Sequence, residues 1–343
     1  MKVAVVILNW NGAEMLRKYL PTVVKMSAVT PDVAVVVADN GSTDDSVDLL
    51  QKEFPTVRTI LLGRNYGFAE GYNLALRQIK ADYYLLLNSD VEIRRNGWLN
   101  PLVEYMDSHQ DVAVCQPKLL SLKSPDCFEY AGAAGGFIDK YGYPFCRGRV
   151  FSTIEKDEGQ YDVDIPLMWA TGAAFMVRSS DYWSVGGLDE RFFAHMEEID
   201  FCWRLRLRGR GVACVPQSTA YHWGGATLNK SNPRKTFLNF RNNRLMLYKN
   251  LPKTSLWKVM FVRGILDMVA AMSFLCQGHF GDFKAVFKAY FAYRRMKKDY
   301  QSIRSDIQRT AVVKDVPERR PYFLLWRYHI RRQRTFKSLE GEA

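Results

Sequence analysis

The residues of this sequence that could do chemistry fall into four short polar clusters. A carboxylate can accept hydrogen bonds from a ligand, coordinate a divalent cation or remove a proton from a hydroxyl group. Each cluster alone is more often a turn or a helix cap. Four of them beside predicted strand or helix ends favour a ligand site. The clusters are Asn9-Trp10-Asn11, Asp39-Asn40-Gly41-Ser42, Asn88-Ser89-Asp90 and Glu197-Glu198-Ile199-Asp200.

Three of these clusters directly follow apolar runs that predict buried strands. The run before Asn88 contains five large apolar residues, as expected of a strand covered on both faces. Between the runs, apolar residues recur at helical spacing, and Ser42 is the expected cap of the second helix. Alternating strands and helices predict a parallel sheet whose carboxyl ends open onto a ligand crevice. The predicted strands are residues 3–8, 33–38, 57–62 and 83–87, and the predicted helices are residues 14–26, 43–54 and 69–79.

The following part of the chain is less regular. Loops and hairpins are expected over residues 121–164, and residues 221–225 read as a loop of ligand-like composition. A helix from the fourth cluster to Leu207 would carry acids in its first turn, where the helix dipole favours negative charge. The remaining strands are expected at residues 112–115, 172–177 and 212–215. Together these elements predict an α/β fold with a mostly parallel central sheet flanked by helices.

Basic residues are concentrated in the last third of the chain. The net charge is +12, and residues 234–343 hold 24 Lys and Arg against 8 Asp and Glu. This asymmetry favours an anionic partner, either a membrane surface or nucleic acid. Residues 257–293 are compatible with helix. Their most apolar part, residues 264–276, reads as too short for a bilayer and contains Asp267, which favours a helix lying in the plane of an anionic leaflet. A helical cap packed on the catalytic body explains the pattern equally well.

Cysteine usage and the N-terminus indicate the compartment. Six cysteines without a Cys-x-x-Cys pair argue against structural zinc and against a disulfide framework. The apolar run after Lys2 is too short for a secretion signal. We therefore expect a cytoplasmic protein.

Several further segments occur in an order and spacing that resembles family 2 glycosyltransferases. These are the inverting nucleotide-sugar enzymes of the GT-A fold, which include rhamnosyl- and galactofuranosyltransferases. The resemblance runs from Val3 to about residue 250. It predicts a GT-A catalytic domain over residues 1–233, with a nucleotide-binding half (1–115) and an acceptor half (116–233), followed by a helical, basic, membrane-proximal extension over residues 234–343. The segments begin at Arg64-Asn65-Tyr66-Gly67, Trp169-Ala170-Thr171-Gly172, Phe192-Phe193-Ala194-His195, Tyr221-His222-Trp223-Gly224-Gly225 and Arg241-Asn242-Asn243-Arg244.

The resemblance assigns most of these residues to the nucleotide sugar. Asp39 would accept a hydrogen bond from the imide or amino edge of the base, since a carboxylate offers only acceptors. A structural role for Asn73, bonded to backbone, and a core position for Trp169 remain open alternatives. The residues expected at the donor are Asn9, Trp10, Asn11, Asp39, Asn65, Gly67, Asn73, Asn88, Ser89, Trp169 and Gly172.

Asn88-Ser89-Asp90 occupies the place of the family's Asp-x-Asp metal motif, with Asn88 replacing the first Asp. Mg²⁺ or Mn²⁺ would therefore be held by Asp90 and by His222, and the imidazole favours Mn²⁺. With one fixed carboxylate, the metal should bind weakly until the donor diphosphate arrives.

The resemblance places the general base in the fourth cluster. Glu198 falls where the family more often has Asp, and it would take the proton of the acceptor hydroxyl on the face opposite the leaving diphosphate. Glu197 and Asp200 are the other candidates. Cations of Arg241-Asn242-Asn243-Arg244 could approach a phosphate or simply be solvated.

We expect an inverting, metal-dependent transfer from a UDP- or dTDP-sugar, with dTDP-rhamnose as one candidate. The acceptor would be a hydroxyl of a glycan or lipid-linked saccharide in cell-surface polysaccharide synthesis, at the cytoplasmic face of the cell membrane. A sugar-phosphate nucleotidylyltransferase would need a Gly-rich basic loop after the first strand. A non-catalytic binder of nucleic acid would leave the acidic strand ends unexplained, and a processive synthase would need spanning helices.

Overall fold

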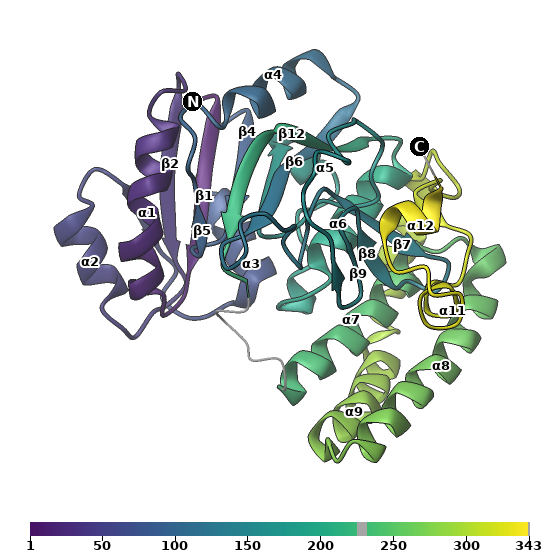
Figure 1. Cartoon of the computed structure of the whole chain (residues 1–343). Coiled ribbons are helices and arrows are strands. Elements are labelled where there is room, and N and C mark those ends of the chain that lie inside the picture. Colours follow the sequence, from purple (N-terminus) through teal and green to yellow (C-terminus); the bar gives the residue numbers. More distant parts are fainter. Residues whose placement is uncertain (225–231, 342–343) are drawn as a thin grey trace.

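The computed structural model describes residues 1–224 and 232–341. Within these residues, two sheets and a set of helices pack together (Figure 1). The larger sheet has eight strands in the order β3-β2-β1-β4-β11-β6-β12-β5 among the described residues. Its strands are β1 (Val3–Asn9), β2 (Val33–Asp39), β3 (Arg58–Leu61), β4 (Tyr83–Leu87), β5 (Val91–Glu92), β6 (Val112–Ser121), β11 (Ala174–Arg178) and β12 (Gly211–His222).

The first four strands of the larger sheet are parallel, as expected. Val3 of β1 pairs with Val33 of β2 and with Tyr83 of β4, so the strands are in register and end at the same edge. Strand β11 runs antiparallel to both of its neighbours, while β6 and β12 are parallel to each other. The prediction of a mostly parallel central sheet is therefore confirmed.

Alternate residues of β1 point into two different cores, because successive side chains of a strand lie on opposite faces. Val3 and Val5 pack with apolar residues of α1, α2 and α4. Ala4 and Val6 pack with residues of α3, α5 and α6. The sheet is thus the middle of three layers. The helices are α1 (Ala13–Ser27), α2 (Ser46–Glu53), α4 (Asn100–Ser108), α3 (Gly67–Leu76), α5 (Ser179–Ser184) and α6 (Glu197–Leu207), with a 3-10 turn η1 (Glu190–Phe192) before α6.

The smaller sheet occupies part of the region predicted as loops and hairpins. It includes one strand from the C-terminal part of the chain, β13 (Arg319–Arg320), which pairs in parallel with β7. Phe336, the first residue of helix α12 (Phe336–Glu340), also packs here, with its ring 5.2 Å from that of Phe137. The basic extension is therefore not helical throughout. The other strands of the smaller sheet are β7 (Gly136–Asp139), β8 (Pro144–Cys146), β9 (Arg149–Val150) and β10 (Thr153–Ile154).

The C-terminal helices follow the larger sheet. Helix α7 contacts α6, α8, α9 and α10, and in Figure 1 the pair α8 and α9 projects from the rest of the molecule. These helices are α7 (Pro233–Asn250), α8 (Lys253–Cys276), α9 (Phe280–Met296), α10 (Gln301–Thr310), α11 (Leu324–His329) and α12 (Phe336–Glu340).

Three predictions of local structure are wrong. Helix α2 begins at Ser46, so Ser42 does not cap it. Tyr221 and His222 are the last residues of β12 and not part of a loop. The apolar residues 264–276 belong to the single 24-residue helix α8, which is long and apolar enough to cross a membrane by length and composition alone. The apolar part is longer than expected because apolar residues before Gly264, such as Val259 and Phe261, continue in the same helix.

Candidate active site

The first polar loop and Asp39 hold each other in place where β1 and β2 end. The register pairs Asn9 with Asp39, and the Asn9 amide donates to Asp39 Oδ2 and to Ser42 Oγ, at 3.2 Å each. Asp39 Oδ1 accepts from the backbone N–H groups of Gly41 and Ser42. A carboxylate offers about four acceptor positions, and these three bonds leave room for a ligand N–H. Trp10 is 45% exposed at the rim, beside the exposed Asn11.

The second polar loop is joined to the loop before α3 by two asparagines. Asn40 donates to Asn65 Oδ1 at 3.3 Å and to the Gly67 carbonyl at 3.0 Å. Gly67 has φ +76°, and a Cβ there would lie 2.5 Å from the ring of Phe193. The backbone N–H of Phe68 donates to the Phe193 carbonyl at 2.6 Å. The predicted donor loops and the loop before α6 are therefore in direct contact.

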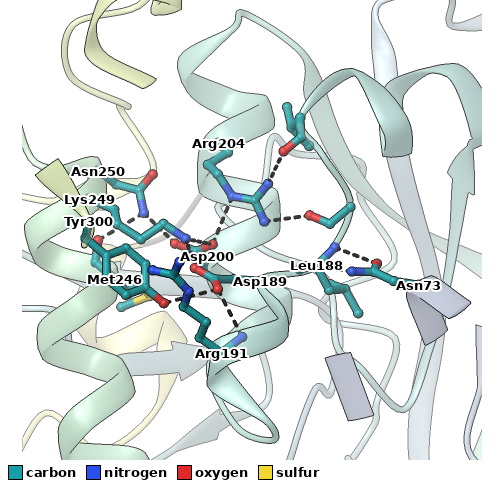
Figure 2. A network of polar contacts seen from close by, with 12 residues as sticks. Asn73, Leu188, Asp189, Arg191, Asp200, Arg204, Met246, Lys249, Asn250 and Tyr300 are labelled. Carbon is teal, nitrogen blue, oxygen red and sulfur yellow. Dashed lines mark hydrogen bonds and ion pairs between the residues drawn. The ribbon is translucent and has the colours of Figure 1, made fainter. Parts of the chain in front are cut away.

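Two of the residues predicted at the donor are structural. Asn73 is buried, and its amide oxygen accepts from Tyr182 and Leu188 while its amide nitrogen donates to Leu188 and Glu190. No hydrogen-bonding capacity is left for a nucleotide. Figure 2 shows the Asn73 amide against Leu188. Trp169 is 2% exposed and donates to the Phe137 carbonyl, so it cannot stack on a sugar.

The strand-end cluster of β4 lies beside the first loop and β11. A Cβ on Gly12 would lie 3.6 Å from Ser89 Oγ. The backbone N–H of half-buried Asn88 donates to the Ala173 carbonyl. A Cβ on Gly172 would lie 3.4 Å from the ring of Phe68 and 3.9 Å from the Cβ of Glu198. The clusters predicted from the sequence thus surround one edge of the sheet.

The candidate metal ligands Asp90 and His222 are brought together by the pairing of β5 with β12. His222 pairs with Val91, the residue after Asp90, and His222 Nε2 lies 3.1 Å from Asp90 Oδ1. On its other side, Nδ1 lies 3.2 Å from Glu129 Oε1. Burial would lower the pKa of His222, but Asp90 and Glu129 raise that pKa to about 10. The motif's Gly225 lies outside the described residues.

These residues fit a divalent cation, which would displace the proton that Asp90 and Glu129 stabilise on the imidazole. A ligating histidine commonly donates its other ring N–H to a carboxylate, and Glu129 occupies that position at Nδ1. Glu129 is itself fixed, because its Oε2 accepts from the backbone N–H groups of Ala131 and Gly132. No group of three or more His, Cys, Asp and Glu side chains that could hold a metal occurs within the described residues. The remaining ligands would therefore come from the diphosphate and water.

Two glutamates at the start of α6 are the candidates for the general base. Glu197 is 5% exposed and Glu198 is half-buried, and the Oε2 atom of each is buried without a hydrogen-bond partner. Burial raises the pKa of Glu198 to about 7. Burial and the neighbouring Glu198 raise the pKa of Glu197 well above its ordinary value. A carboxylate with a pKa near neutrality is suited to accept a proton.

The loop before these glutamates has an unusual backbone that α7 holds in place. Phe193, His195 and Met196 have φ of 66°, 70° and 71°, which costs non-glycine residues stability. The buried Asn242 amide donates to the carbonyls of Phe192, Ala194 and His195 at 2.8–3.0 Å.

The arginines flanking Asn242 serve the fold as well. Arg241 donates to the carbonyls of Arg191 and Phe192. Arg244 forms a buried ion pair with Asp267 of α8. Both guanidinium groups are thus engaged within the protein, and neither is a simply solvated cation.

Asp200 is not a candidate base, contrary to the sequence prediction. It is 0% exposed and accepts from Arg204 Nε, Lys249 Nζ and Asn250 Nδ2 at 2.8–2.9 Å. Burial would raise the pKa of Asp200, but Lys249 and Arg204 hold that pKa below its ordinary value. Figure 2 shows the network, in which Lys249 also contacts Asp189. Asp200 therefore joins α6 to α7 and cannot reach a substrate.

Sequence reasoning missed three residues of this site: Glu129, Asn242 as a support of the loop, and Lys249. Glu129 gives no signal in the sequence, because it lies in the irregular stretch before the smaller sheet. The segment from Arg241 to Arg244 draws attention for its cations, whereas its role in the site belongs to the Asn242 amide.

Comparison with known proteins identifies the domain. Residues 4–132 match the glycosyl transferase family 2 model. An N-acetylglucosaminyl-diphospho-decaprenol L-rhamnosyltransferase of Mycobacterium tuberculosis is 26% identical over 236 residues, which cover 64% of this chain and 75% of the relative. The dTDP-rhamnosyl transferase RfbF of Shigella flexneri is 26% identical over 266 residues, 71% of this chain and 82% of the relative.

Solved structures show the same fold. The structure of GalNAc-T7 with UDP, GalNAc and Mn²⁺ has a TM-score of 0.57 at 14% identity, covering 73% of this chain and 48% of that one. This chain therefore spans about half the length of that protein. A mannosyltransferase from Pyrobaculum calidifontis in complex with GDP-Man and Mn²⁺ has a TM-score of 0.50 at 12% identity, covering 90% and 84%. Residues 4–132 therefore match glycosyl transferase family 2, the chain has the GT-A fold, and these likenesses support glycosyltransferase activity.

Proposed function

We propose that the chain moves one sugar, with inversion, from a UDP- or dTDP-sugar to a hydroxyl of a glycan or lipid-linked saccharide. The observation that carries this is the pair of glutamates at the start of α6. Each carboxylate has one buried, unpaired oxygen, and Glu198 lies close to Gly172, because a Cβ on that glycine would be 3.9 Å from the Cβ of Glu198. Two relatives support the donor and acceptor classes, since their names specify a dTDP-rhamnosyl transferase and a rhamnosyltransferase for N-acetylglucosaminyl-diphospho-decaprenol.

In this proposal Glu198 removes the acceptor proton. The acceptor oxygen forms a bond to the anomeric carbon as the bond from that carbon to the diphosphate oxygen breaks. The proton passes to the Glu198 carboxylate, and the products are the glycoside and the nucleoside diphosphate. Burial and the neighbouring Glu198 raise the pKa of Glu197 well above its ordinary value, and in its protonated form Glu197 would donate a hydrogen bond to an acceptor oxygen.

The donor would be held by the edge where β1, β2 and β4 end. Asp39 would accept from the base N–H, with Asn9 and the backbone of Gly41 fixing its carboxylate. Asp90 and His222 would hold Mg²⁺ or Mn²⁺, which when bound offsets the negative charge of the diphosphate. Glu129 keeps the imidazole oriented.

The test combines binding with turnover. Thermal shift and calorimetry against UDP, dTDP, GDP and their sugars, with and without Mn²⁺, should show stabilisation by a uridine or thymidine diphosphate. Transfer from dTDP-rhamnose to an N-acetylglucosaminyl-diphospho-lipid analogue is the first activity to assay. Glu198→Gln should lower kcat by about 10² or more, as expected for loss of a general base. Stabilisation by no nucleotide, or a Glu198→Gln variant within about tenfold of wild type, contradicts the proposal.

A protein that acts on a lipid-linked acceptor works at a membrane surface. We therefore also propose that the chain is a peripheral protein of the cytoplasmic face of the cell membrane.

A further inference from the structure

Helix α8 exposes one apolar face along most of its length. Trp257 is 77% exposed and its ring stacks on that of Phe261, which is 58% exposed. The spacing of the exposed residues places them on one side of the helix, over about 22 Å from the first to the last. A contiguous apolar surface of this kind marks an interaction site. The exposed residues are Trp257, Phe261, Ile265, Met268, Val269 and Met272.

The opposite face of α8 is fixed to the body of the protein. Asp267 accepts from Arg263 of α8 and from Arg244 of α7, each at 2.7 Å, and all three side chains are buried. Arg263 also donates to the Tyr141 carbonyl beside the smaller sheet. Removing one partner from such a buried cluster is strongly destabilising. Only one side of α8 is therefore exposed to the surroundings of the protein. A helix that lies in the plane of a membrane has this arrangement, whereas a helix that crosses a membrane is surrounded by lipid or protein on all sides.

The exposed charged residues of α8, of α9 and of the turn after α9 are almost all basic. Between Lys253 and Asp299, all of which the structure describes, the exposed side chains include eight basic residues and one acidic residue, Asp299. Two copies of the chain meeting through this surface would bring like charges together, whereas an anionic bilayer would attract them. The eight basic residues are Lys253, Lys258, Lys284, Lys288, Arg294, Arg295, Lys297 and Lys298.

We propose that α8 lies in the plane of an anionic lipid bilayer, with its exposed apolar face at the boundary between headgroups and acyl chains and the basic residues of α8 and α9 at the headgroups. In the view of Figure 1, α8 and α9 lie toward the same side as the ends of β1, β2 and β4. The assignment names the membrane-contacting surface of the proposed function. The assignment rests on the proposed function only for the reason why the protein would bind a membrane. The exposed face and the charge around it are observed independently of that function.

The experiment is co-sedimentation of the full chain with vesicles of phosphatidylcholine, alone or mixed with phosphatidylglycerol. The test variant is Phe261→Glu with Val269→Glu, two residues 58% and 62% exposed. The matched control is Val29→Glu with Val163→Glu, which are 53% and 63% exposed on other parts of the surface. Because the four side chains are exposed, neither variant disturbs the core. A third variant, Lys284→Gln with Lys288→Gln, tests the charge.

Wild type and the control should bind the mixed vesicles much more tightly than phosphatidylcholine alone. The test variant should bind roughly a hundredfold more weakly, since two apolar contacts are lost and two charges are added. The lysine variant should bind roughly tenfold more weakly, and less so at high salt. All variants should keep the affinity of wild type for the nucleoside diphosphate. If no nucleotide binds but vesicle binding follows this pattern, the proposed function fails and the membrane surface stands.

Three results would overturn the membrane assignment. One is wild type that stays in the supernatant with both vesicle types. Another is a test variant that sediments as well as the control. The third is a wild-type protein that does not bind vesicles and is a dimer by sedimentation equilibrium, together with a test variant that is a monomer. That result would assign the exposed face to a contact with a second copy of the chain.

Discussion

Replacing Asn242 with leucine tests whether this residue positions Glu198, the proposed base, in addition to stabilising the fold. Asn242 is fully buried, and its amide donates to three carbonyls of the loop before α6. Leucine has the same branching at Cγ as asparagine, with two methyl groups in place of the amide oxygen and nitrogen, but it donates no hydrogen bond. The carbonyls of Ala194 and His195 then lose this partner, whereas the Phe192 carbonyl keeps its bond from Arg241. The loop residues with positive φ lose the contact that holds them.

Two opposing contributions determine the expected change in the free energy of unfolding. An amide nitrogen carries two hydrogens, so the three contacts share about two hydrogen bonds. Leaving two buried carbonyls unpaired costs about 2–6 kcal/mol. Relaxation of the three left-handed residues returns part of this, since each stores about 1–3 kcal/mol. We expect a net loss of about 2 kcal/mol in the free energy of unfolding. The relaxed loop moves Glu198, and a displacement of about 1 Å can lower kcat about 10²-fold.

The assay measures kcat, the donor KM and the pH profile of kcat, together with the free energy of unfolding from urea titration. The donor KM should change little. Burial raises the pKa of Glu198 to about 7 in the wild type, and a displaced, better solvated carboxylate has a lower pKa. The acid limb of the kcat profile should therefore move to lower pH, which a general loss of stability would not produce.

Asn243 provides the matched control. It is the next residue of α7, is 1% exposed and donates to the Gly142 carbonyl at 2.7 Å, away from the loop before α6. Asn243→Leu should lower stability but leave kcat and its pH profile unchanged. The reasoning is refuted if Asn242→Leu keeps the kcat and acid limb of wild type while losing stability, or if Asn243→Leu lowers kcat to the same extent.

Three further predictions follow from the site. The pKa of Glu198 rises from an ordinary 4.5 to about 7 on folding, so ionisation of this carboxyl lowers the stability of the fold as the pH rises from 4.5 to 7. Glu198→Gln should therefore raise the free energy of unfolding at pH 8 by roughly 2 kcal/mol, allowing for partial exposure of the side chain, and should leave it unchanged at pH 4. Equal urea titration curves for both proteins at pH 8 would contradict this. Lys249→Met should lower stability by about 3–5 kcal/mol, because buried Asp200 loses a charge partner; a melting temperature like that of wild type would show that the network is dispensable. Calorimetry should find weak Mn²⁺ binding to the free protein and tighter binding with nucleoside diphosphate, and Asp90→Asn should abolish the difference.

The sequence is informative where polar residues directly follow strands. Parallel strands in register bring such residues to one edge, so the proximity of Asn9 and Asp39 could be predicted from local pattern alone. The pairing of Asp90 with His222, 132 residues apart, depends on where β12 lies in the sheet. No local signal gives that position, and only the family resemblance indicates it.

The sequence could not predict which of the polar side chains would be buried. Asn73 and Asp200 have the residue types of ligand-binding groups, but Tyr182, Leu188 and Lys249 from distant segments occupy their hydrogen-bonding positions. Trp169 is taken into the core in the same way. The same reasoning explains why Glu129 could not be found, since its partner His222 comes from a distant strand.

The smaller sheet has a consequence for how the protein is made. The backbone N–H of Phe336 donates to the Glu155 carboxylate, 181 residues earlier in the chain, and β13 completes the sheet that β7 begins. At a synthesis rate of about 5–20 residues per second, roughly 10–35 s separate the two segments on the ribosome. Through that interval Phe137 and its aromatic neighbours lack part of their cover. The smaller sheet is therefore completed only after α8 and α9, the helices of the proposed membrane surface, have been synthesised.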